Sequence, residues 1–340
     1  MNTTVIGLDI AKQISHLVGL DATGKQVEKK TLRRAKLLAY FANHTPCVIG
    51  IEGCASSHHW AREFRKLGHT VKLLPAQYVK PYVRGNKNDY NDALAIAEAS
   101  RVPEMREVRV KTIEQQSIQA LHRFRRGAVA DRTKLCNQTR GLLAEFGIIM
   151  NQGIGTLRKR FPEILEDGGN ELHWIFRDAL ALKYEQLCQL DALVGKLTKS
   201  IEDEAKQHAQ IKQLQSIPGF GAIVASTFFS VMGDGKSFSK GRDVSASLGL
   251  VPRQHSSGGK NTLLGISKRG DKYLRSLLVH GARSVVIHAH KKDDALSLWV
   301  TRLVETRGKN KAIVALANKL ARIAWAVTTS GKPYQTNFSI

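Results

Sequence analysis

The 340-residue chain lacks the marks of several protein classes. Its only cysteines are Cys47, Cys54, Cys136 and Cys188, and their wide spacing fits neither a zinc site nor a disulfide framework. No apolar run reaches about 18 residues, so no membrane-spanning helix is predicted. The first residues also lack the basic and apolar segments of a signal peptide. We therefore expect a protein of the reducing cytoplasm with no membrane partner.

Acidic residues are scarce relative to basic ones. The chain has 52 Lys and Arg against 29 Asp and Glu, a net charge of +23. Such a balance indicates a polyanionic partner, most often nucleic acid, although ribosome-associated and merely soluble basic proteins share it. Residues 211–340 hold 20 basic and 6 acidic residues, whereas residues 111–210 hold 15 and 13. The C-terminal third is the main electrostatic footprint, and we expect salt-sensitive binding.

Residues 1–110 alternate between patterns of strand and helix. Short apolar runs predict strands at 4–9, 16–20, 47–52 and 70–74, and helical patterns cover 58–67 and 91–100. This alternation is typical of an α/β domain.

Residues 111–210 carry apolar side chains at helical spacing. Members of the first series recur every seven residues, and members of the second step by three and four. They are Leu121, Ala128, Leu135 and Leu142, and then Leu187, Leu190, Val194, Leu197 and Ile201. The patterns predict amphipathic helices long enough to pair as a coiled coil. Pairing between subunits and a bundle inside one subunit both remain open, because periodicity does not name the partner.

Residues 211–340 are basic and mostly helical, with a Gly/Ser-rich centre at 255–260 that we expect to be polar and flexible. Residues 217–221 (IPGFG) predict the turn of a helix-hairpin-helix element. There the backbone of Gly219 and Gly221 approaches a phosphate, although such pentapeptides also form plain turns. Residues 266–275 (ISKRGDKYLR) open a helix with cations suited to phosphates. The candidate phosphate contacts are Arg253, Lys268, Arg269 and Arg275.

Four acidic residues stand where a metal site could form. Asp9 and Glu52 each end an apolar strand, where an unpartnered buried carboxylate costs several kcal/mol. Asp89 and Asp92 share one face of a helix. Singly, Asp9 could cap a turn and Asp92 could be solvated. Together, oxygen ligands without His or Cys suit Mg²⁺ rather than Zn²⁺, and two such ions could assist phosphoryl transfer.

Two sets of motifs extend over nearly the whole chain in a consistent order. The N-terminal set is 7–12 (GLDIAK), 51–53 (IEG) and 87–93 (KNDYNDA); the C-terminal set is 217–221, 248–253 (LGLVPR), 257–258 (SG), 267–270 (SKRG) and 274–275 (LR). In these motifs the sequence resembles the DEDD transposases of the insertion-sequence one-ten family, whose relatives include the Piv DNA invertase. One departure is Asn88, where the family more often has Thr; both acids that follow remain.

The resemblance implies a three-part organisation. Residues 1–110 would form an RNase H-like, RuvC-like domain with a DEDD site for Mg²⁺, or Mn²⁺, at Asp9, Glu52, Asp89 and Asp92. Residues 111–210 would be a helical coiled-coil region for oligomerisation. Residues 211–340 would be a serine-containing transposase domain that binds DNA and RNA.

The resemblance also implies a nucleophile, which the motif places at Ser257. Its hydroxyl would attack a DNA phosphodiester and form a covalent phosphoserine link, which conserves phosphoester energy. Only the alignment favours Ser257 over Ser256, and a serine in a Gly/Ser loop is most often only part of the loop.

The implied partners are donor and target DNA and a noncoding bridge RNA that pairs with both. A homo-oligomer, a dimer or a tetramer built as a dimer of dimers, would work at the bacterial nucleoid. Two other hypotheses remain open at this point. One is a RuvC-type metal nuclease that uses water and forms no covalent link. The other is a non-enzymatic nucleic-acid binder.

Overall fold

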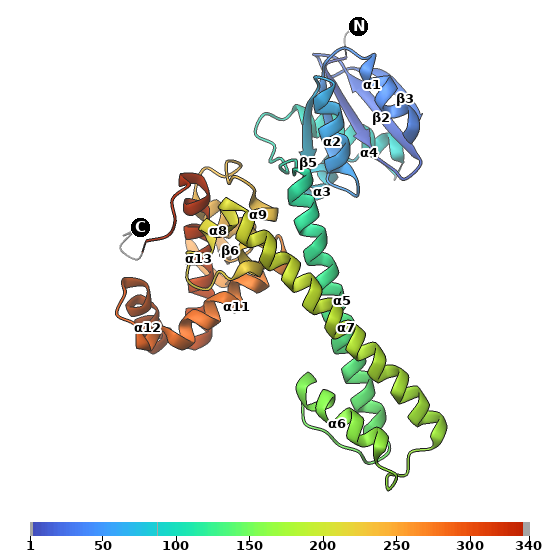
Figure 1. Ribbon diagram of the computed structural model, residues 1–340. Helices are drawn as coiled ribbons and strands as arrows, with labels where there is room; N and C mark the ends of the chain where they lie inside the picture. The colour runs from blue at the N-terminus through green and yellow to red at the C-terminus, as the bar shows by residue number, and fades with distance from the viewer. Residues whose placement is uncertain (1–2, 87, 336–340) are drawn as a thin grey trace. The chain divides into compact units, whose positions relative to one another are not determined.

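The computed structural model describes residues 3–86 and 88–335 (Figure 1). The chain divides into two compact units, Met1–Thr112 and Ile113–Ile340. The second unit includes most of the 111–210 segment together with the 211–340 segment. Lys87, which opens the third N-terminal motif, lies outside the described residues.

A five-stranded mixed sheet forms the centre of the first unit, in the order β3-β2-β1-β4-β5. Its strands are β1 (Val5–Asp9), β2 (Ile14–Leu20), β3 (Gln26–Arg33), β4 (Val48–Glu52) and β5 (Thr70–Leu74). β1 pairs antiparallel with β2 and parallel with β4, and β4 pairs parallel with β5. The predicted mixed α/β N-terminal domain is therefore confirmed.

Helices pack on the sheet of the first unit. They are α1 (Leu37–Ala42), α2 (Ser57–Lys66), α3 (Ala76–Val79), α4 (Asp89–Arg101) and the 3-10 turns η1 (Arg34–Lys36) and η2 (Lys80–Tyr82). Side chains of α1 and α2, among them Phe41 and Phe64, pack in one core cluster with β1 and β4. α4 packs closely on β1, because a Cβ at Gly7 would lie 2.0 Å from the carbonyl oxygen of Ala93. This contact fixes the start of α4 against the sheet.

Two long helices, α5 (Ile113–Ala144) and α7 (Trp174–Gln207), pack as an antiparallel pair in the second unit (Figure 1). α6 (Ile154–Glu166) lies at the end of the pair where α5 leads into α7. Leu135 of α5 and Leu187 of α7 belong to a buried apolar cluster that α6 shares, whereas Leu142 of α5 is 46% exposed. The predicted amphipathic helices thus pair within one chain. A coiled coil between subunits stays a prediction.

Shorter helices form the largest core of the second unit. They are α8 (Ala209–Leu214), α9 (Ala222–Met232), α10 (Gly241–Ser247), α11 (Lys272–His288), α12 (Ala295–Arg307), α13 (Lys309–Ser330) and the 3-10 turn η3 (Ala289–Lys291). The largely helical C-terminal region is therefore confirmed. Among the described residues α13 is long and apolar enough to cross a membrane, by length and composition alone. Half of that apolar stretch is buried, and residues such as Leu316 and Leu320 pack in this core.

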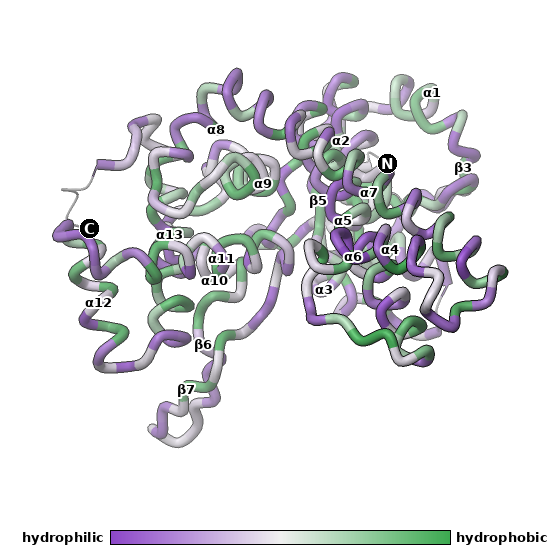
Figure 2. Tube along the Cα trace, turned by 60° about the horizontal axis from the view of Figure 1, so that its bottom comes forward, coloured by the Kyte–Doolittle hydropathy of each residue, from purple (hydrophilic) through white to green (hydrophobic). Residues whose placement is uncertain are grey.

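The stretch 255–260, expected to be flexible, belongs to a β-hairpin whose register shifts between Pro252 and Gln254. β6 (Pro252–Ser257) pairs antiparallel with β7 (Lys260–Ile266), and the hairpin projects from the helices of the second unit (Figure 2). Gly258 and Gly259 form its two-residue turn with φ of +55° and +79°. Positive φ at both positions matches the right-handed twist of the strands, and glycine adopts it without steric cost. The two glycines thus define a turn.

Candidate active site

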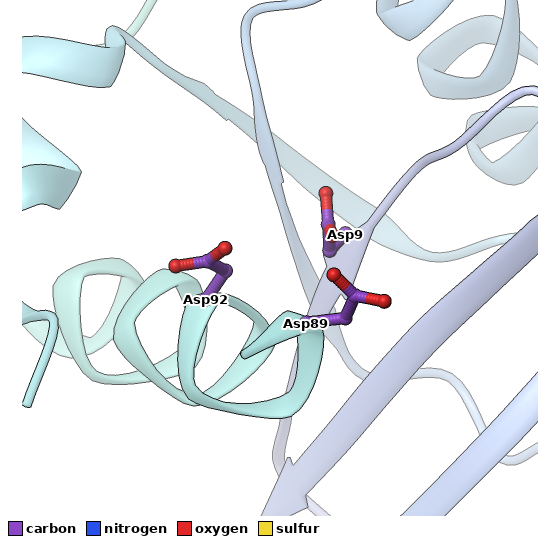
Figure 3. A group of neighbouring side chains, drawn as sticks. All are labelled: Asp9, Asp89 and Asp92. Carbon is purple, nitrogen blue, oxygen red and sulfur yellow. The ribbon is translucent and has the colours of Figure 1, made fainter. Parts of the chain in front are cut away.

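Three aspartates converge where β1 ends and α4 begins (Figure 3). One carboxylate oxygen from each of Asp9, Asp89 and Asp92 lies within 4.8 Å of the others. Asn88 begins α4 by accepting a hydrogen bond from the backbone N–H of Tyr90 at 2.9 Å. This cap places Asp89 and Asp92 in the first turn, where the helix dipole favours negative charge.

Glu52, the fourth predicted acid, lies at the end of β4 beside β1 but outside this group of three. β1 and β4 pair through Leu8 and Ile51, the residues just before Asp9 and Glu52. Burial, and then the charge of Asp92, raise the pKa of Glu52. Glu52 therefore belongs to the same electrostatic environment, and its role as a metal ligand stays a prediction.

The three aspartates repel one another. Burial raises the pKa of Asp9, and the charges of Asp92, Asp89 and Glu52 raise it further, whereas His16 lowers it. Carboxylates gathered at this density are relieved by a cation, and an all-oxygen donor set suits a hard divalent ion. The residues present therefore fit a divalent-metal centre.

His16 is a neighbour of this site that sequence reasoning missed. It is the β2 register partner of Asp9, and its Nδ1 lies 3.4 Å from Oδ2 of Asp89. Its ring also meets the edge of Tyr90, with centroids 4.8 Å apart. Pairing the predicted strands 4–9 and 16–20 across their turn would have placed His16 opposite Asp9. The contacts of His16 restrict the orientation of the Asp89 carboxylate.

Ser257 is the last residue of β6 and is exposed at the turn of the hairpin. Its neighbour Ser256 donates to Oδ1 of Asn261 at 2.9 Å and accepts from Nε2 of Gln254 at 2.8 Å. In the part of the chain that the structure describes, the Ser257 hydroxyl makes no hydrogen bond. The geometry thus leaves the Ser257 oxygen more available than that of Ser256, a distinction that the sequence did not provide.

The four candidate cations differ in their surroundings. Arg253, Lys268 and Arg269 are exposed and form no ion pair with any residue that the structure describes. Arg275 instead donates from its Nη1 to the carbonyl oxygens of Leu248 at 2.9 Å and Arg269 at 2.7 Å. Arg275 therefore joins two backbone segments.

The IPGFG segment at 217–221 connects α8 to α9. Gly219 has a φ of +83°, and a Cβ there would lie 2.7 Å from the carbonyl oxygen of Gly281 in α11. Gly221 is exposed and stands at the N-cap of α9. Packing against α11 is thus sufficient to explain Gly219. A phosphate contact at Gly219 or Gly221 stays a prediction.

Comparison with known proteins identifies relatives over the whole chain. Residues 6–148 match the model of the DEDD transposase domain of IS110 elements, and residues 211–297 match "Transposase IS116/IS110/IS902 family". A probable family 20 transposase of Pseudomonas aeruginosa is 44% identical, with 98% of this chain and 99% of the relative aligned. The transposase for insertion sequence element IS1111A of Coxiella burnetii is 42% identical, over 97% of this chain and 91% of the relative.

A more distant relative is a gene-inverting protein. The pilin gene-inverting protein of Moraxella lacunata is 25% identical over 98% of both chains. The DEDD domain indicates a divalent-metal requirement and identifies the chain as a DNA transposase and recombinase enzyme. The chain therefore belongs to the IS116/IS110/IS902 family of insertion-sequence transposases, the one-ten family that its motifs resemble.

Proposed function

We propose that this transposase cuts and rejoins DNA through a covalent link to Ser257, with Mg²⁺, or Mn²⁺, bound by Asp9, Glu52, Asp89 and Asp92. The observation that carries this proposal is the convergence of Asp9, Asp89 and Asp92 within 4.8 Å. An oxygen-only donor set favours these hard ions over Zn²⁺.

An RNase H-like, RuvC-like fold for the first unit is part of the proposal. Its support is the strand order β3-β2-β1-β4-β5, in which an antiparallel meander precedes two parallel strands. Asp9 and Glu52 end the adjacent strands β1 and β4, and α4 brings Asp89 and Asp92 close to the end of β1.

The chain's own residues perform the strand exchange in this scheme. The Ser257 hydroxyl loses its proton as its oxygen bonds to phosphorus. One backbone P–O bond of the DNA breaks and the leaving DNA oxygen takes up a proton, so the number of phosphoester bonds is unchanged. A DNA hydroxyl can then attack the phosphoserine and reseal a strand without ATP. When bound, a divalent cation stabilises negative charge on the phosphate oxygens. Asp9 and Asp89 would hold that cation in place, with Asp89 oriented by His16.

Strand exchange between two duplexes needs more than one active site. We propose a dimer, and a tetramer built as a dimer of dimers, in which the acids of one subunit serve Ser257 of another. The α5–α7 pair would provide a coiled-coil contact between subunits. Isologous contacts of this kind generate closed dimers.

The proposed substrates are donor and target DNA at the bacterial nucleoid, guided by a noncoding bridge RNA. Base pairing would then read sequence, while the protein contacts backbone shape. Arg253, Lys268 and Arg269 are the proposed phosphate contacts, with 217–221 as a helix-hairpin-helix element. Their support is exposure, together with the basic composition of residues 211–340.

A denaturing gel tests the covalent step. The full chain is incubated with element-end DNA, its flanking noncoding RNA and Mg²⁺. We expect a protein–DNA species that survives denaturation, is lost in Ser257→Ala and persists in Ser256→Ala. DNA cleavage by Ser257→Ala at the normal rate, without such a species, would instead establish the RuvC-type nuclease that uses water.

A further inference from the structure

A large cavity lies at the root of the β6–β7 hairpin. It has a volume of about 970 Å³ and lies in the second unit. Pro252 and 264–266 line it from the hairpin, and Trp299 lines it from α12. One face of α13, from Asn310 to Arg322, completes the wall. We refer to this cavity as the α13 groove.

Positive charge is concentrated along the α13 groove. Lys311, Lys319 and Arg322 line it, no lining residue is acidic, and none of the three pairs with a carboxylate among the described residues. At 1.5 Å per residue, Lys311 and Arg322 are separated by about 16 Å along the helix. A row of this length can contact more than one phosphate of a single strand.

Apolar side chains also line the α13 groove. They include Leu250, Val314 and Ala315, together with Trp299, whose ring centroid lies 4.5 Å from the Lys319 ammonium. Bases inside a duplex are stacked and cannot reach such side chains, whereas unpaired bases can place their faces on them. Cations beside apolar and aromatic surface are typical of sites for single strands.

A smaller cavity extends the cationic surface. It has a volume of about 330 Å³ and shares Arg322 with the α13 groove, and Lys240, Arg242 and Trp325 also line it. At the hairpin, β6 leads from Pro252 at the groove to Ser257 at the tip, a distance of about 17 Å for an extended strand. A strand held in the groove therefore lies within a few nucleotides of Ser257.

We propose that the α13 groove binds a single-stranded segment of the DNA substrate, beside the phosphate that Ser257 attacks. The choice of DNA as occupant rests on the proposed function. Groove binding itself needs neither the Ser257 hydroxyl nor a metal ion. A second copy of this chain is a poorer occupant, because it carries a net charge of +23 and would meet three cations without carboxylate partners.

Fluorescence anisotropy with a labelled oligothymidylate of about 12 nucleotides, without divalent cation, tests the proposal. The full chain is compared with Lys311→Gln/Arg322→Gln and with the control Lys196→Gln/Lys199→Gln, which removes two exposed charges from α7. We expect the groove variant to bind about tenfold more weakly, with the log–log salt slope reduced by about 1.4, as two lost contacts to a single strand predict. The control should stay within about twofold of the native chain.

Tryptophan quenching gives a second reading of the same site. Oligothymidylate should quench the tryptophan fluorescence of the native chain and of the control Trp174→Phe. Trp174 lies on α7 and is 65% exposed. The variant Trp299→Phe should lose roughly half of the quenching or more. Equal weakening in the groove and α7 variants would overturn the proposal. The proposal would also be overturned if the groove variant lost more affinity for oligouridylate or duplex DNA than for oligothymidylate. A third contrary result is a groove variant that binds oligothymidylate as the native chain does but has an altered oligomeric state. The groove would then be a contact between copies of the chain.

These measurements separate the groove from the covalent mechanism. Loss of the Ser257 adduct with intact groove binding would contradict the proposed function alone, whereas an intact adduct with normal oligothymidylate binding by the groove variant would contradict the groove alone.

Discussion

Single residues that the sequence marked for nucleic acid turn out to have different surroundings. Arg253 extends from β6 without a protein partner among the described residues, whereas Arg275 donates to two backbone carbonyl groups. Sequence composition shows that both are cationic. It does not show which cation the fold already uses, because that depends on how 248–250 and 268–270 pack together.

Replacement of Arg275 should therefore affect stability more than binding. We expect Arg275→Lys to lower the free energy of unfolding by about 1–3 kcal/mol, because the lysine side chain is one bond shorter and its ammonium does not reach the position from which Nη1 donates to both carbonyls. Since the charge is kept, DNA affinity should stay within about twofold. Arg253→Gln is the comparison variant. Its free energy of unfolding should change by less than about 0.5 kcal/mol, while its DNA affinity falls. Urea denaturation and anisotropy measure both quantities, and the reverse pattern would contradict the assignment.

The close contact between Gly219 and Gly281 can be tested by the sign of the change in the free energy of unfolding on Gly→Ala substitution. In an exposed helix Gly→Ala stabilises by about 1 kcal/mol, which we expect for Gly195→Ala in α7, since no described atom lies within 4 Å of a Cβ there. In α11, a Cβ at Gly281 would lie 2.4 Å from the carbonyl oxygen of Gly219. Gly281→Ala should therefore destabilise the protein by about 1–3 kcal/mol in urea denaturation. Stabilisation by both substitutions would show that the contact relaxes freely.

At the scale of elements, the apolar strands were predictable and the polar ones were not. Runs such as 4–9 and 70–74 predict β1 and β5 because buried strands need apolar side chains. β3 carries Glu28, Lys29 and Lys30 and is largely exposed, and β6 is exposed at every position, so neither has an apolar pattern. Their pairing comes from neighbouring strands and from the glycine turn. Asp9 and Glu52 could be singled out because a carboxylate at the end of an apolar strand is unusual. The convergence of Asp9, Asp89 and Asp92 within 4.8 Å required the packing of α4 on β1.

The contact between α5 and α9 predicts a pH-dependent stability. His122 of α5 is 2% exposed, and its Nε2 lies 2.9 Å from the Ser226 hydroxyl of α9. Burial, followed by the charge of Arg125, lowers the pKa of His122 to about 4 from an ordinary 6.5. Between these values the unfolded chain binds more protons. The stabilisation is therefore full above pH 6.5 and is lost as the pH falls towards 4, by up to about 3 kcal/mol.

His122→Gln, which can still donate to Ser226, removes this titration. Urea denaturation from pH 7 to pH 4 should show a smaller loss of stability in the variant than in the native chain. Parallel pH profiles would mean that His122 does not titrate across the folding transition.

At the scale of the whole molecule, the net charge of +23 should govern affinity. Each phosphate contact on duplex DNA contributes about −0.9 to the log–log slope of affinity against salt, so five contacts give about −4.5. We expect a slope steeper than about −4 for duplex DNA between 50 and 200 mM salt, measured by anisotropy. A nearly flat response would show that the cations of residues 211–340 do not meet phosphates.

The central claim is that Asp9, Asp89 and Asp92 form a divalent-metal centre, and titration of the full chain with Mn²⁺, followed by electron paramagnetic resonance, tests it most directly. The exposed Glu104 offers a matched control in the same unit, as Glu104→Gln. We predict that the native chain and Glu104→Gln bind Mn²⁺ alike, and that Asp89→Asn and Asp92→Asn each bind roughly tenfold more weakly or worse. Equal Mn²⁺ affinity in all four proteins would contradict the account.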